Sequence, residues 1–121
     1  MDRRRVARWV LGLALLAGAA SGEGWAHHGW SSYDEARPLS LTGTVEEASF
    51  EHPHAAARVR AEGRSWLVVL PPPTRAVALG VTRELLRPGV RVTVEGYPHR
   101  RQPNELRAVR LVVDEQVFRL R

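Results

Sequence analysis

The 121-residue sequence contains no cysteine and no lysine, and its single methionine is the initiating Met1. Without cysteine, the chain has no disulfide to stabilise its fold and no thiolate to act as a metal ligand or a nucleophile. Without cysteine or an internal methionine, we expect no site for soft Cu(I). All 18 basic residues are arginine, which we interpret as a coding bias of a GC-rich bacterial genome and not as a functional feature.

The sequence also lacks the patterns of common catalytic sites. It has no glycine-rich phosphate-binding loop. Glu46 and Glu47 are adjacent, so in a strand they face opposite sides and cannot act as a carboxylate pair. Residues 28–34 contain a histidine, two serines and an aspartate, but a polar arm is poorly suited to hold the geometry of a catalytic triad. We therefore expect no enzymatic activity.

No apolar run is long enough to span a membrane. The longest, residues 9–20, has 12 residues, whereas a transmembrane helix needs about 20. It follows the basic "MDRRRVAR" and precedes "SGEGWA", in which Gly24 and Ala26 are the small residues before a cut. This order is typical of a secretory signal peptide over residues 1–26. An earlier cut and an uncleaved N-terminal anchor are the alternatives.

Cleavage after residue 26 leaves 95 residues, enough for one small domain, with no stable membrane span. Four arginines and two acidic residues leave with the leader, so the net charge falls from +5 to +3. We expect the mature protein to be periplasmic or secreted. An exported protein does not meet chromosomal DNA, so this basicity is a weak indication of nucleic-acid binding, and we expect no nucleic-acid partner.

Alternation of apolar and polar residues predicts six strands in the mature chain. They span residues 40–47, 55–61, 66–70, 90–95, 106–113 and 117–121. The third strand, "WLVVL", is apolar on both faces, which predicts a central position buried on both sides. Gly43 in the first strand indicates a bend or the close approach of another strand.

Two short helical turns are predicted between the third and fourth strands. Thr74 is expected to cap the first turn, which ends at Gly80, and Thr82 is expected to cap the second. Three strands, a helical segment and two more strands follow the order of the OB-fold, a five-stranded Greek-key barrel. We predict an all-β, OB-like barrel over residues 40–121 with an N-terminal arm over residues 27–39. A small open β-sandwich is the alternative.

Several short motifs follow one another along the mature chain. They are "AHHGW" after the leader, "LTGTVEE", "HPHA" and "LRPGVRVTVEGYPHR". In these motifs the chain resembles a family of small secreted bacterial proteins, the domain of unknown function 6152, over roughly residues 26–121. Where family members read "NPH", this chain has His52-Pro53-His54, so His52 is a feature of this sequence. The resemblance implies secretion, a cut before His27 and a compact β-rich domain, and it implies no activity.

Four of the five histidines are candidate metal ligands: His27 and His28 in the arm, and His52 and His54 in the loop between the first two strands. A cut before His27 places a free amine beside the imidazole of the same residue. Both groups can lose their protons near neutral pH and chelate one metal ion. A third nitrogen from another of these histidines gives a site that suits Cu(II), with Zn(II) or Ni(II) next. Solvated loop side chains are the alternative.

The loop between the fourth and fifth strands contains "YPHRR", with Tyr97, His99, Arg100 and Arg101. Guanidinium groups bind carboxylates and phosphates through paired hydrogen bonds. These four residues are the predicted binding residues for an anion, a glycan or an acidic partner, and an exposed polar loop is the alternative. We therefore expect a non-enzymatic periplasmic module that binds a small ligand. Metal binding through the histidines and interaction with an envelope protein are the alternative functions.

Overall fold

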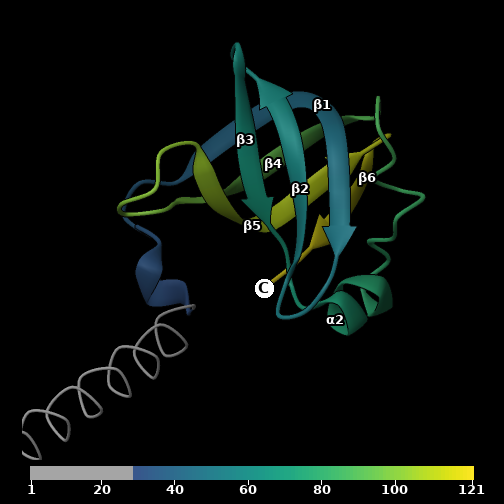
Figure 1. Ribbon diagram of the computed structural model, residues 1–121, viewed down its shortest axis with the longest axis horizontal. Coiled ribbons are helices and arrows are strands. Elements are labelled where there is room, and N and C mark those ends of the chain that lie inside the picture. The colour runs from purple at the N-terminus through teal and green to yellow at the C-terminus, as the bar shows by residue number, and fades with distance from the viewer. Residues whose placement is uncertain (1–28) are drawn as a thin grey trace, which may run out of the picture. The chain divides into compact units, whose positions relative to one another are not determined.

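The computed structural model describes residues 29–121 of the chain (Figure 1). The chain divides into two compact units between Ser32 and Tyr33. In the described part of the first unit, the 3₁₀ turn η1 (Trp30–Ser32) is closed by a hydrogen bond from the Ser32 N–H to the Gly29 carbonyl at 3.2 Å. The predicted signal peptide, His27 and His28 lie outside the described residues.

The second unit is a six-stranded sheet with one short helix. Its elements are β1 (Leu39–Phe50), β2 (Ala55–Ala61), β3 (Arg64–Val69), α2 (Pro73–Ala78), β4 (Arg91–Pro98), β5 (Glu105–Val113) and β6 (Gln116–Arg119). The strand order is β3-β2-β1-β4-β5-β6, and β3 also pairs in parallel with β5. This pairing closes the first five strands into a barrel with the OB-like order (Figure 1). The predicted all-β barrel with a helical segment between β3 and β4 is confirmed.

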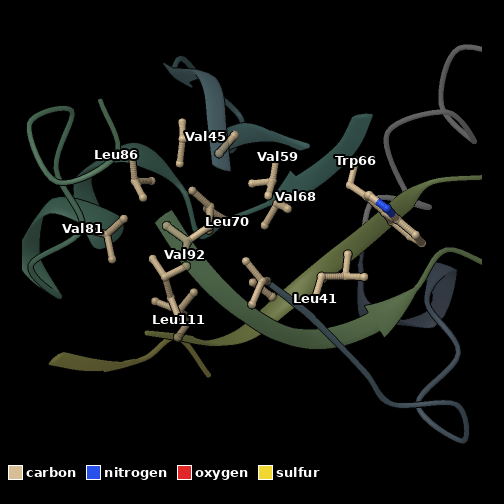
Figure 2. Packing of buried hydrophobic residues seen from close by; sticks show 14 of the residues in the cluster. Leu41, Val45, Val59, Trp66, Val68, Leu70, Val81, Leu86, Val92 and Leu111 are labelled. Carbon is tan, nitrogen blue, oxygen red and sulfur yellow. The ribbon is translucent and has the colours of Figure 1, made fainter. Parts of the chain in front are cut away.

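The barrel interior is filled by apolar side chains from alternate strand positions. Figure 2 shows Trp66 and Leu41 at one end of this cluster and Val81 and Leu86 at the other. Val92 is 2% exposed and points inward, as the alternation of β4 predicts. Each such Val or Leu contributes roughly 1.5–3 kcal/mol by leaving water. Among the described residues, the buried side chains are those of hydrophobic residues, and none is charged.

Strand β3 differs from its prediction. Trp66 and Val68 are buried, whereas Leu67 and Val69 are only half-buried. The expectation of burial on both faces is wrong, because the outer face of a barrel strand is turned toward solvent. The apolar run therefore predicts the burial of the inward-facing residues of β3 correctly, and it predicts too much burial for the outward-facing residues.

Two glycines allow neighbouring strands to approach closely. A Cβ built on Gly43 lies 2.1 Å from the Arg60 carbonyl oxygen, and one built on Gly96 lies 2.1 Å from the Arg107 carbonyl oxygen. No side chain fits at either distance unless the backbone moves. The close approach predicted at Gly43 is confirmed, and Gly96 is its counterpart in β4.

Helix α2 begins two residues earlier than expected. Pro72 is the N-cap residue and makes no side-chain capping bond, and Pro73 occupies the first turn, where a missing N–H leaves no hydrogen bond unmade. Thr74 as the cap is therefore wrong. Gly80, with φ 93°, follows the end of the helix as predicted. Thr82 caps the second turn by accepting a hydrogen bond from the Leu85 N–H at 3.1 Å.

The last two strands form a hairpin beside a bulge. Asp114 and Glu115 make the two-residue turn with φ values of 49° and 67°, as a type I′ turn requires. Glu95 pairs with Arg110 and Gly96 with Ala108, so Val109 is the extra residue in β5. Its carbonyl accepts a hydrogen bond from the Leu120 N–H at 2.9 Å.

Within residues 29–121, no helix has the length and apolar character needed to cross a membrane.

Candidate functional site

Residues 33–38, which we name the docked arm, pack against the β4–β5 loop. Because Leu39 pairs with Gly96 near the end of β4, the segment before β1 lies beside the segment that leaves β4. Tyr33 is 6% exposed and forms a β-bridge with His99. The two rings meet edge to face, with centroids 5.1 Å apart. The docked arm therefore covers a loop more than 60 residues away in the sequence.

Two further hydrogen bonds fix the docked arm. The Tyr33 hydroxyl donates to Glu105 Oε2 at 2.8 Å, and the Asp34 N–H donates to the Pro98 carbonyl at 2.9 Å. Burial, followed by the hydrogen bond to Glu105, raises the pKa of Tyr33 above its usual value. The hydroxyl thus keeps its proton and donates throughout the physiological pH range.

The docked arm and the β4–β5 loop line a pocket with a volume of about 460 Å³, which we name the arm–loop pocket. Its lining residues come from the arm, the start of β1, the barrel interior and the loop. They are Asp34, Arg37, Pro38, Leu39, Trp66, Pro98, His99 and Arg100. Segments that are distant in sequence therefore meet at one end of the barrel.

His99 contributes a hydrogen-bond donor to this lining. Its Nδ1 accepts hydrogen bonds from the backbone N–H groups of Arg101 and Gln102, each at 3.0 Å. A neutral imidazole accepts at one nitrogen and donates at the other. The hydrogen therefore lies on Nε2, and the backbone of the loop selects this tautomer.

Trp66 lines the same pocket and carries a buried donor. Its side chain ends the core cluster beside Leu41 (Figure 2) and lines the arm–loop pocket. The residue is 9% exposed, and its indole N–H has no acceptor among the described residues. A buried donor without a partner costs roughly 1–3 kcal/mol. An acceptor atom bound in the pocket would remove that cost.

The arginines of the pocket differ in their partners. Arg100 Nη1 lies 3.9 Å from Asp34 Oδ1, which also accepts a hydrogen bond from the Ala36 N–H at 3.1 Å. Within residues 29–121, no carboxylate lies within 4.0 Å of the Arg37 guanidinium. The lining thus holds two guanidinium groups, an imidazole and an indole N–H against one carboxylate.

The structure separates the four predicted binding residues of "YPHRR". His99 and Arg100 line the arm–loop pocket. Tyr97 lines a different pocket with the outward-facing residues of β4, because successive strand residues point to opposite faces. Arg101 is exposed and lines neither pocket. Arg37 and Trp66 were not predicted, although the OB strand order itself places the start of β1 beside the end of β4.

The predicted metal ligands remain untested. His52 and His54 lie in the β1–β2 loop, at the opposite end of β1 from the β4–β5 loop. The two loops are well separated in Figure 1, where the β1–β2 loop lies near α2. In the described part of the chain, no three His, Asp or Glu side chains form a group that could hold a metal ion. Metal binding that involves His27 and His28 stays a prediction.

Comparison with known proteins identifies the family. Residues 14–106 match the Family of unknown function (DUF6152). The chain belongs to this family. The match confirms the resemblance that the sequence motifs indicated, and it includes every residue that lines the arm–loop pocket. No curated protein matches this DUF6152 protein.

Solved structures with a similar fold include those of TiaS. The complex of TiaS with its tRNA and ATP matches with a TM-score of 0.51 and 20% identity, over 67% of this chain and 19% of that one. Apo TiaS, a tRNA agmatidine synthetase, gives 0.50 and 21%, over 66% and 18%. The ZRD-deleted mutant of TiaS in complex with agmatine gives 0.53 and 18%, over 72% and 27%. This DUF6152 protein thus shares a fold with a small part of those longer chains.

Proposed function

We propose that this protein is a non-enzymatic binding module that holds a small anion, a carboxylate or a phosphate, in the arm–loop pocket. The excess of hydrogen-bond donors in the pocket carries the proposal. Arg37 and Arg100 offer charge-assisted hydrogen bonds, which are about twice as strong as neutral ones. His99 and Trp66 add neutral N–H groups, and the only carboxylate of the lining is that of Asp34.

Binding, and not catalysis, suits the composition of this lining. The eight lining residues include no serine, threonine or cysteine that could act as a nucleophile. Asp34 Oδ1 already accepts a hydrogen bond from a backbone N–H and lies near Arg100. A bound oxyanion that accepts the indole N–H would satisfy the buried donor of Trp66. The same export signal that we predict over residues 1–26 would bring the module to periplasmic or extracellular anions.

Calorimetric titration of the mature protein with phosphate and with acetate tests the proposal. We expect one saturable anion site, and we expect added sodium chloride to weaken binding because the interaction is between charges. Arg37→Gln should weaken binding at least about tenfold, equivalent to ~1.4 kcal/mol. Arg101→Gln is the matched control, since this exposed arginine lines neither pocket, and should bind like wild type.

Two results would overturn the proposal. The first is the absence of saturable binding for both anions at low salt. The second is equal affinity of wild type and Arg37→Gln, which would place the anion elsewhere. Interaction with another envelope protein, the alternative from the sequence, would instead give weak binding of small anions together with binding of a protein partner.

A further inference from the structure

A second pocket, which we name the outer-wall pocket, lies on the outside of the barrel and has a volume of about 560 Å³. It is lined by Pro38, Leu39, Ser40, Glu95, Gly96, Tyr97, Val109, Arg110 and Arg119. The bulge at Val109 helps to position these residues. The Val109 carbonyl bonds the Leu120 N–H, and this bond holds Arg119 next to the bulge.

The two pockets share lining residues at the start of β1. Pro38 and Leu39 line both the arm–loop pocket and the outer-wall pocket. Neither residue carries a charge or a side-chain hydrogen-bonding group. A ligand that occupies both pockets must therefore pass a short apolar stretch, which favours a hydrocarbon chain over a peptide backbone at that point.

Each pocket has one arginine that faces a carboxylate and one that does not. In the outer-wall pocket, Arg110 Nη1 lies 2.6 Å from Glu95 Oε2. Among the described residues, no carboxylate lies within 4.0 Å of the Arg119 guanidinium. Arg119 in the outer-wall pocket therefore resembles Arg37 in the arm–loop pocket, because neither guanidinium has a carboxylate of the described residues within 4.0 Å. Among the described residues, each pocket therefore has one lining arginine without a carboxylate within 4.0 Å, and the two pockets share the apolar residues Pro38 and Leu39.

We propose that the two pockets form one site for an aliphatic dicarboxylate, a linear molecule with a carboxylate at each end. One carboxylate binds Arg37, the hydrocarbon chain crosses Pro38 and Leu39, and the other carboxylate binds Arg119. The inference rests on the proposed function for its first half. Once one end of the ligand is bound, binding of the other end is intramolecular. The affinity for the linked ligand therefore exceeds the affinity of either site for a single carboxylate.

A matched series of ligands tests the proposal on the mature protein by calorimetry. The dicarboxylates succinate, adipate, suberate and sebacate are compared with the monocarboxylates butyrate, hexanoate, octanoate and decanoate. We expect one dicarboxylate to bind at least about tenfold more tightly than the monocarboxylate of the same length. The chain length of that dicarboxylate would report the span between the two arginines.

Three variants separate the two halves of the site. Arg119→Gln should lower the affinity for the dicarboxylate to that for the matched monocarboxylate. Arg37→Gln should lower the affinity for both kinds of ligand. Arg91→Gln is the control, because Arg91 is exposed and lines neither pocket, and it should change nothing. All three positions are exposed, so a thermal melt of each variant should match wild type.

The outcomes distinguish this inference from the proposed function. If no dicarboxylate binds more tightly than its matched monocarboxylate, or if Arg119→Gln keeps the advantage, the two-ended site is wrong. Monocarboxylate binding that still depends on Arg37 would then leave the proposed function intact. If neither kind of ligand binds to wild type, both proposals are wrong.

Discussion

The two histidine-bearing loops of the barrel look alike in sequence and differ in structure. His52 and His54 surround Pro53 in the β1–β2 loop, and His99 follows Pro98 in the β4–β5 loop. The ring of His99 is held by two backbone N–H groups and an edge-on tyrosine, and it lines a pocket. His52 is exposed, and neither His52 nor His54 lines either pocket.

The difference comes from what covers each loop. The docked arm lies on the β4–β5 loop and adds Tyr33, Asp34 and Arg37 to it. A polar loop acquires the features of a site when a distant segment limits its freedom and brings further donors beside it. The residues of a loop alone are therefore a weak guide to its function.

The largest expected effect comes from a core substitution that unfolds the barrel and so disrupts both loops. Val92→Asp places a carboxylate without a partner in the apolar core and should lower the free energy of unfolding by about 3 kcal/mol or more. Thr93→Asp, on the outer face of β4, should cost roughly 1 kcal/mol or less. Urea unfolding measures both. If Val92→Asp unfolded like wild type while Thr93→Asp was unfolded, the inward and outward faces of β4 would be assigned the wrong way round.

The next effect is confined to the β4–β5 loop. Tyr33→Phe removes the hydrogen bond to Glu105 and should lower the free energy of unfolding by roughly 1.5–3 kcal/mol, as for bonds to charged groups. It should also weaken phosphate binding, because the docked arm lines the pocket. Glu105→Gln keeps an acceptor oxygen and should lose less stability. Unchanged stability and unchanged phosphate affinity in Tyr33→Phe would show that the arm is not held through this bond.

The same hydroxyl predicts a dependence on alkaline pH. The unfolded chain releases its phenolic protons near pH 10, whereas burial and the Glu105 hydrogen bond raise the pKa of Tyr33 in the folded chain. The resulting stability is complete below about pH 10 and is lost as pH rises through the raised pKa. Urea unfolding at about pH 9 and about pH 11 should show a decline that Tyr33→Phe reduces. Equal declines in both proteins would contradict the prediction.

A smaller effect concerns the β1–β2 loop and the predicted amino-terminal copper site. Mature protein that begins at His27 should bind one Cu(II), and one extra glycine before His27 should weaken binding about tenfold, ~1.4 kcal/mol, by breaking the chelate. His54→Ala should weaken it less, because it removes one monodentate ligand. Binding should fade below about pH 6 as protons compete. Titration against a competing chelator, with N-terminal sequencing of exported protein, measures this.

Equal affinity with and without the extra glycine would leave His27 and His28 as part of an ordinary tether. A native cut at another position would have the same consequence, because His27 would then have no free amine.

The smallest effect separates two adjacent arginines. Arg100→Ala should weaken phosphate binding by up to about fivefold, since Arg100 is exposed and shares its charge with Asp34. Arg101→Ala should leave the affinity unchanged. Both are measured by the phosphate titration at low salt. A larger loss for Arg101 than for Arg100 would mean that the loop binds anions outside the arm–loop pocket.

The strands could be predicted because their signal is local. Alternate valines in β4 report the inward face directly, and the glycine in β1 reports a close strand crossing. Strand order then supports the OB-like barrel. The start of α2 was misplaced because Pro72 and Pro73 begin the helix without a side-chain cap, before the threonine that resembles one.

Most of the candidate site could not be predicted, because it depends on contacts that no local pattern contains. His99 and Arg100 were found from their residue types. Tyr97 was grouped with them by sequence proximity, and strand alternation then turns it to the outer wall. Trp66 was expected only in the core, whereas it also lines the pocket.

The contacts that hold the docked arm also set when the binding site can first exist. Tyr33 bonds Glu105, 72 residues later, and Glu35 bonds Arg121, 86 residues later. Contacts of such sequence separation form late, after the entropy of closing the loop between them has been lost. A chain that has been synthesised only as far as β4 lacks the residues that fix the arm. The docked arm is thus fixed in place only after Glu105, the partner of the buried Tyr33, has joined the fold.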